Sequence, residues 1–184
     1  MQRPHSAPRQ TGFTLVELLI VAIILAILAA IIIPQFASTT VDAQESALRA
    51  NVAGLRSAID LYRQQHGTYP GVNAASGGAC TGTAGTGVAA SQQALQDQLT
   101  RYSNTAGQTC SVADAGYAFG PYLREDILPT NPISGSGVFA IVNTGNLEMA
   151  ADGANLGWKY DTTAGKLIVN DTNLDSQGIA YSTY

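Results

Sequence analysis

The sequence predicts an α+β protein in which one long N-terminal helix packs on a small antiparallel β-sheet. Three observations indicate this fold. Residues 18–33 are all apolar, and an amphipathic helical pattern follows between residues 48 and 62. Short apolar strand patterns separated by turn residues fill the last third of the chain. We therefore expect a helix with a membrane-spanning first half and an amphipathic second half that covers the sheet.

Composition excludes several classes of function. The chain has 184 residues, enough for one domain or one domain plus an appendage, and 12% of them are charged. Of nine Lys and Arg residues, Arg3 and Arg9 precede residue 12, which leaves seven against thirteen Asp and Glu. This acidic balance argues against nucleic acid as the main partner. Two His and two Cys argue against a His-based triad, a zinc site with several His or Cys ligands and an iron–sulfur cluster. We expect no cofactor, with calcium as the one alternative considered below.

The first structural element is the apolar segment Phe13–Ile33. As a helix its 21 residues extend about 31 Å, which is enough to cross a bilayer core. The preceding residues carry Arg3 and Arg9 and no acid. The positive-inside rule therefore predicts a cytoplasmic N-terminus, with the rest of the chain outside the inner membrane.

Three interpretations of this segment compete: a cleaved secretory signal, a plain signal anchor, and a retained helix with a dedicated function. The apolar run is too long for an ordinary signal, whose core has roughly 7–15 residues. Glu17 fits neither of the first two, because a carboxylate deep in the membrane costs about 2–3 kcal/mol and usually serves a function or meets a partner. The alternative for Glu17 is an interfacial, solvated carboxylate.

Residues 12–19, Gly-Phe-Thr-Leu-Val-Glu-Leu-Leu, resemble the prepilin signature of type IV pilins and type II secretion pseudopilins. The resemblance implies that a prepilin peptidase cuts between Gly12 and Phe13, methylates the new N-terminus at Phe13, and leaves the helix in place. It also implies that Glu17 and the Phe13 amine act in assembly. The chain then divides into a leader peptide (1–12), the transmembrane and assembly half of the helix (13–36), and a pilin-like globular domain (37–184).

Pro34 interrupts the helical pattern. A proline removes one helical hydrogen bond and clashes with the preceding turn, so it either stops or kinks a helix. We expect a kink or a locally melted stretch, because an apolar stripe resumes at Leu48, Val52, Leu55, Ile59 and Tyr62. The helix should run to about Gln65, with Gly67 as a left-handed C-cap.

The rest of the chain predicts a loop-rich globular part. Residues 67–90 read as loop, Ser91–Tyr102 as a short helix capped by Ser91, and Gly137–Asn143 as a strand. Two further strand patterns, Trp158–Asp161 and Lys166–Asn170, flank a four-residue turn and predict a hairpin.

This outline also matches the pilin family. The segment from Leu61 to Pro70 and the segments Tyr122-Leu123 and Leu128–Pro132 resemble the major, G-type pseudopilins. The Trp-Gly pair that usually follows the last proline is replaced by Ile133-Ser134. The resemblance therefore favours a major pseudopilin, with a type IV pilus subunit as the alternative.

The chain offers two further candidate sites. Cys80 and Cys110 lie in the part expected outside the inner membrane, where the oxidising compartment favours a disulfide over two free thiols. Residues 171–175, Asp-Thr-Asn-Leu-Asp, place oxygen ligands at alternate positions, as calcium loops do. The sixth and twelfth positions are Ser176 and Ser182, which favours a solvated acidic segment, although major pseudopilins bind calcium near the C-terminus.

We therefore expect a non-enzymatic subunit of a helical filament. The resemblance implies further copies of the chain, prepilin peptidase, an inner-membrane assembly platform and minor pilins or pseudopilins as partners. The subunit would lie in the membrane before assembly, with its globular domain in the periplasm or outside the cell. Adhesion, motility or DNA uptake would be the role of a type IV pilus subunit. A remote alternative is a membrane-tethered extracytoplasmic binding module that never polymerises.

Overall fold

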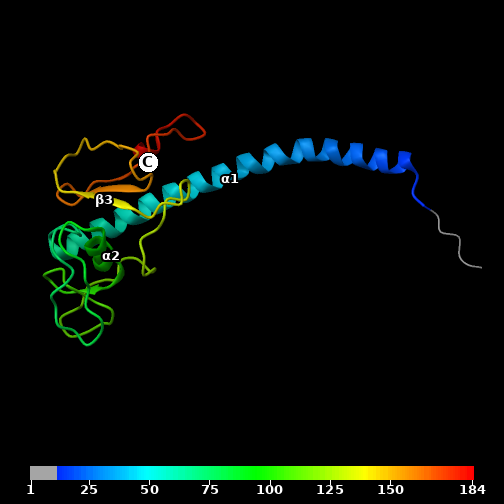
Figure 1. Cartoon of the computed structure of the whole chain (residues 1–184). Helices are drawn as coiled ribbons and strands as arrows, with labels where there is room; N and C mark the ends of the chain where they lie inside the picture. The colour runs from blue at the N-terminus through cyan, green and yellow to red at the C-terminus, as the bar shows by residue number, and fades with distance from the viewer. Residues whose placement is uncertain (1–11) are drawn as a thin grey trace, which may run out of the picture. The chain divides into compact units, whose positions relative to one another are not determined.

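A computed structural model of the protein describes residues 12–184, without the side chains of residues 33–38. The chain divides into two compact units, Met1–Thr40 and Val41–Tyr184. The elements (Figure 1) are, in chain order, α1 (Leu15–His66), α2 (Gln92–Thr100), β1 (Tyr102–Ser103), β2 (Thr109–Cys110), β3 (Phe139–Val142), β4 (Trp158–Asp161), β5 (Leu167–Val169) and the 3-10 helix η1 (Tyr181–Thr183).

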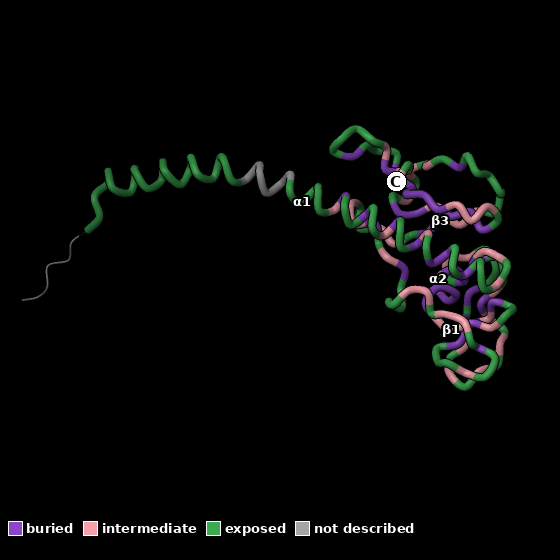
Figure 2. The backbone as a smooth tube through the Cα atoms, turned by 180° about the vertical axis from the view of Figure 1, so that it is seen from behind, coloured by how far each residue is buried: buried purple, intermediate pink, exposed green. Residues whose placement is uncertain are grey.

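The first unit contains the apolar part of α1. The segment Leu15–Ile32 has a mean hydropathy of 3.2 and is long and apolar enough to cross a membrane. Each residue from Gly12 to Ile32 is exposed, as the uniform colour of this stretch in Figure 2 shows. Its large apolar side chains keep between 46% and 80% of their surface uncovered. Apolar surface in water is unfavourable by about 25 cal/mol per Å², so this segment requires lipid or other protein around it.

In the second unit, hereafter the head, α1 buries the stripe that the sequence predicts. The five stripe residues keep no more than 2% of their surface exposed; they are Leu48, Val52, Leu55, Ile59 and Tyr62. The helix ends at His66. Gly67 has φ +73° and its N–H donates to the carbonyl of Arg63 at 2.8 Å, which confirms the predicted left-handed C-cap.

The stripe faces a three-stranded sheet with the order β3-β4-β5. Strands β4 and β5 form the predicted hairpin, in which Trp158 pairs with Val169. Strands β3 and β4, however, are parallel, with Phe139 opposite Trp158, so the sheet is mixed and not wholly antiparallel as predicted. Parallel neighbours need a crossover of a dozen or more residues, and residues 143–157 provide it.

Trp158 on β4 connects the sheet to the segment Leu128–Pro132. Its side chain is fully buried, and its indole N–H donates to the carbonyl of Pro129 at 2.9 Å. The adjacent Asn131 is also fully buried, and its side-chain amide donates to the carbonyl of Leu156 at 2.8 Å. The irregular connection is thereby fixed against the start of the central strand β4.

The short helix α2 organises the Gly-rich loops around it. Ser91 caps the helix as predicted, since its hydroxyl accepts a hydrogen bond from the N–H of Ala94 at 3.0 Å. Gln98 is fully buried and ties three loop positions together. Its carbonyl oxygen accepts from the N–H of Gly71 at 2.6 Å, and its amide nitrogen donates to the carbonyls of Asn73 and Gly107 at 3.0 and 2.9 Å.

We expect Gln98→Leu to destabilise the head by about 3 kcal/mol, because an apolar side chain leaves these buried loop groups without a partner. The change should lower the midpoint of chemical unfolding of the head. Gln96→Leu is the matched control on the same helix, because Gln96 is half-buried and makes a single 3.3 Å bond to the carbonyl of Asp126. Equal stability of the two variants would contradict this role of Gln98.

Candidate functional site

The residues at the predicted cleavage point lie directly before α1 and are exposed. Gly12 and Phe13 precede the helix, and Phe13 is 77% exposed. A Cβ atom added to Gly12 would meet no described atom within 4 Å. A larger side chain at residue 12 would therefore not disturb the described part of the fold.

Thr14 is the N-cap of α1, which our sequence analysis did not identify. Its hydroxyl oxygen accepts a hydrogen bond from the backbone N–H of Glu17 at 3.2 Å. Thr14 and Glu17 have the spacing of a capping box, in which a Ser or Thr at the N-cap precedes a Glu by three residues. The sequence signal for this N-cap is the pattern Thr-x-x-Glu directly before an apolar run.

Glu17 lies in the first turn of α1 and is exposed. It is the sole charged residue between Thr14 and Ile32. A carboxylate in the first helical turn interacts favourably with the helix dipole, but it is unfavourable inside a membrane. The carboxylate is thus placed on an otherwise apolar surface, four residues after Phe13.

Two predicted features fall outside the described residues. The leader up to Thr11 is one of them. The other is the kink at Pro34, since the side chains of residues 33–38 are not described. Helix α1 itself continues past Pro34 to His66, so the proline does not stop the helix.

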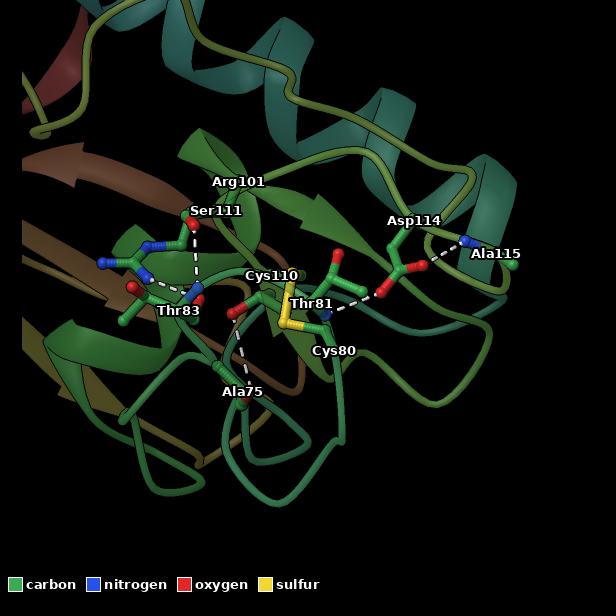
Figure 3. Close-up of a disulfide and its surroundings, with 10 residues drawn as sticks. Ala75, Cys80, Thr81, Thr83, Arg101, Cys110, Ser111, Asp114 and Ala115 are labelled. Carbon is green, nitrogen blue, oxygen red and sulfur yellow. Dashed lines mark hydrogen bonds between the residues drawn. A yellow bond between two sulfur atoms is a disulfide. The ribbon is translucent and has the colours of Figure 1, made fainter.

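The predicted disulfide is present between Cys80 and Cys110, with 6.1 Å between their Cα atoms. In Figure 3 the disulfide lies among hydrogen bonds between this loop and the residues at the end of β2. One of them is donated by the backbone N–H of Thr83 to the hydroxyl of Ser111 at 2.9 Å. The two cysteines are separated by 30 positions in the sequence, and the loop that the bond closes contains α2. Restriction of that loop in the unfolded chain contributes about 3–4 kcal/mol to the stability of the head.

The predicted calcium-loop residues are engaged with other groups. The Asp171 carboxylate accepts from the N–H and the side-chain amide of Asn173 at 2.9 and 2.8 Å. Asp175 contacts the guanidinium of Arg49 at 3.0 Å. Among the described residues, no three His, Cys, Asp or Glu side chains are grouped in a way that could hold a metal ion. Calcium binding at residues 171–175 stays a prediction.

His66 is a packing residue of the head. Its ring stacks on Tyr62 with 3.9 Å between centroids, and its Nδ1 and Nε2 atoms lie 3.1 Å from the Tyr62 carbonyl and the Ser103 hydroxyl. Burial lowers the pKa of His66 below its ordinary value, so the ring is neutral near pH 7. No described carboxylate or cysteine is hydrogen-bonded to this ring, consistent with a structural role.

The described residues define a class of protein: a globular head and an exposed helix that is long and apolar enough to cross a membrane. Residues 7–33 match the family model described as the prokaryotic N-terminal methylation motif. This match confirms the resemblance drawn from residues 12–19 and places the predicted cleavage point within the motif.

The proteins to which the chain is similar include a type II secretion core protein and pilins. The chain is 36% identical over 62 residues to type II secretion system core protein G of Pseudomonas aeruginosa, which covers 34% of this chain and 44% of the relative. It is 43% identical over 68 residues to a fimbrial protein of Neisseria meningitidis serogroup B, covering 37% and 40%. It is 41% identical over 68 residues to the type IV major pilin protein PilE1 of Neisseria gonorrhoeae, covering 37% and 41%.

The chain spans about two fifths of the length of the curated relatives that it matches. No solved structure shows a significant match to the chain. The two groups of relatives match with comparable identity, so the comparisons relate the chain to pilins and pseudopilins together.

Proposed function

We propose that the protein is a structural subunit of a pilus-like filament and has no enzymatic activity of its own. The observation that carries the proposal is the combination of the methylation motif with a fully exposed apolar helix and a separately packed head. Such a helix is stable only where lipid or other protein covers its apolar surface. A bilayer provides that cover before assembly, and the helices of neighbouring copies provide it in the filament.

The route to the filament that we propose combines the charges at the N-terminus with the resemblance to prepilins. Arg3 and Arg9 favour a cytoplasmic leader and a head in the periplasm or outside the cell. Prepilin peptidase removes the leader after Gly12 and methylates Phe13. The inner-membrane assembly platform then extracts the subunit, and the Glu17 carboxylate pairs with the Phe13 amine of a neighbouring subunit. Minor pilins or pseudopilins are further partners.

Within this class we favour a pseudopilin of a type II secretion system. The similarity to core protein G and the G-type features around residues 61–70 and 122–132 support this assignment. A type IV pilus subunit for adhesion, motility or DNA uptake is the second candidate, supported by the similarity to the Neisseria pilins. A tethered binding module that never polymerises is the remote alternative, and the methylation motif argues against it.

Deletion of the gene separates the two leading candidates. Loss of enzyme secretion, with surface fibres and twitching unaffected, selects the pseudopilin. Loss of surface fibres with normal secretion selects the pilus subunit. A deletion that affects neither process, combined with a protein that never leaves the membrane fraction, would support the tethered module and contradict the filament proposal.

A further inference from the structure

The outer edge of strand β3 is a surface that the proposed function does not use. β3 lies at one end of the order β3-β4-β5, so within the described residues no further strand lies beside it. An edge strand presents backbone N–H and C=O groups that can pair with an extended segment of another chain. Such pairing is prevented where another part of the protein covers the edge.

The backbone groups of β3 alternate between β4 and the open side. The carbonyls of Val138 and Val142 accept hydrogen bonds from the backbone of β4 and of the residue after it, both at 2.9 Å. These two residues therefore face β4. Because successive residues of a strand direct their backbone groups to opposite sides, the odd-numbered residues between 137 and 143 face the open side.

Gln92 covers the first part of this open side. It is the first residue of α2 and is half-buried. Its side-chain nitrogen Nε2 donates to the carbonyl of Gly137 at 3.0 Å, and its oxygen Oε1 accepts from the N–H of Phe139 at 2.9 Å. A neighbouring strand would offer the same two groups, one N–H and one C=O, to β3. The Gln92 amide thus takes the place of one residue of a fourth strand.

The second part of the edge stays open. Among the described residues, neither the N–H nor the C=O of Ile141 has a hydrogen-bond partner on this side. The Ile141 side chain packs against the core of the head, so the strand holds these groups in position. One outward N–H and one outward C=O on the same residue are self-complementary. Ile141 of one copy can exchange both hydrogen bonds with Ile141 of a second copy in an antiparallel pair.

Gln92 obstructs this antiparallel pair. In a pair centred on Ile141, Phe139 of one copy lies opposite Asn143 of the second copy, because the two strands run in opposite directions. The N–H of Phe139 would then donate to the carbonyl of that Asn143, at the place where the Gln92 oxygen already lies. The twofold symmetry repeats the conflict at the other end of the pair. Gln92 therefore blocks the residue pairs on both sides of the central one.

The opposite edge of the sheet is closed in the same manner. The N–H of Asp161 donates to the carbonyl of Lys166 at 2.9 Å, so Lys166 faces β4 and the next residue, Leu167, faces outwards. The outward carbonyl of Leu167 accepts from Nε and Nη2 of Arg56 on α1 at 3.3 and 2.9 Å. At each edge, a polar side chain from a helix thus occupies a position where another strand would bind.

We propose that Gln92 is a plug that prevents the β3 edges of two copies from pairing. The pairing would be harmful in a filament, because a twofold axis through the pair reverses the direction of the second head. Subunits of one filament run in the same direction, so a reversed pair could not enter it. This consequence rests on the proposed function, whereas the plug itself rests on the contacts of Gln92 alone.

Disulfide trapping with the full chain in detergent micelles tests the plug. Positions 140 and 142 lie opposite each other in a pair centred on Ile141, so Ala140→Cys and Val142→Cys are made separately and mixed. The two native cysteines are bonded to each other, which leaves the introduced thiol as the reactive one. After mild oxidation with copper phenanthroline, we expect about tenfold more disulfide between positions 140 and 142 with Gln92→Ala than with Gln92 in place.

Two further variants make the result specific. Gln92→Asn keeps the amide but is one methylene shorter, so it cannot reach the edge and should raise the yield as Gln92→Ala does. Gln93→Ala is the matched control, because Gln93 is exposed and bonds to Asp97 within α2 at 2.9 Å. It should leave the yield at the wild-type level.

Three outcomes would overturn the proposal. They are equal yields with and without Gln92, an equal rise with Gln93→Ala, and disulfides between two copies of position 140 that are as frequent as those between positions 140 and 142. The last result would show contacts without the pairing centred on Ile141. Because the assay uses no filaments, failure of the filament assignment would leave each of these results unchanged.

Discussion

Gly12→Val should leave the leader attached to the chain. We expect the cleaved form to fall at least a hundredfold and Phe13 to remain unmethylated, because a peptidase that reads the backbone beside the scissile bond has no room for a branched side chain. A Cβ atom at residue 12 would contact no described atom, so the fold cannot account for the effect. Mass spectrometry of the N-terminal peptide measures both cleavage and methylation.

Gly54→Val is the matched control for this variant. Gly54 lies on α1, is exposed, and likewise leaves open space for an added Cβ atom. The control should be cleaved and methylated normally. A methylated Phe13 at the N-terminus of Gly12→Val would refute the cleavage assignment.

Glu17→Val should give a stable, membrane-inserted and cleaved protein that fails to enter filaments. Glu17 lies in the first unit, outside the packed head, so the head should keep its stability. The apolar replacement removes an unfavourable charge from the membrane, so poor insertion cannot explain a loss of assembly. We expect the filament yield to fall at least tenfold.

The proposed physical reason is an ion pair between subunits. After cleavage, Phe13 carries a positive amine, and the Glu17 carboxylate of an incoming subunit can neutralise it. In a low-dielectric environment such a pair is much stronger than at a surface, and removal of one partner leaves the other buried and unpaired. The pair would also align each new subunit along the filament axis.

Shearing and immunoblotting in cells without the wild-type copy measure this assembly. Glu125→Val is the control, because it removes the same charge from an exposed position of the head. It should assemble at the wild-type level. Wild-type filament yield from Glu17→Val would contradict the pairing mechanism.

Structural features that depend on residues close together in the sequence could be predicted from it. The stripe from Leu48 to Tyr62, the C-cap at Gly67 and the N-cap at Ser91 were predicted and are present, because each depends on residues within one or two helical turns. The Thr14 capping box is equally local, and the sequence signal for it was overlooked. The disulfide between Cys80 and Cys110 could be predicted because the chain has two cysteines and both lie in the part expected in an oxidising compartment.

Contacts between residues far apart in the sequence could not be predicted in the same way. The parallel pairing of β3 with β4 depends on the path of residues 143–157, and no local pattern reports that path. Gln98 reads as an ordinary polar position of a short helix, yet the surrounding loops bury it completely. Glu45 and Ser176 are 131 residues apart in the chain, and a single sequence contains no signal that pairs them.

The assignment as a filament subunit is tested most directly by the intact mass of the chain recovered from filaments. Cells that overproduce the protein together with its assembly machinery are sheared, and the fibres are purified and analysed by mass spectrometry. We predict a chain that begins at N-methylated Phe13, retains the whole apolar helix and contains the Cys80–Cys110 bond. A chain that occurs solely in the membrane fraction, with residues 1–12 still attached and no copies in the fibres, would contradict the assignment.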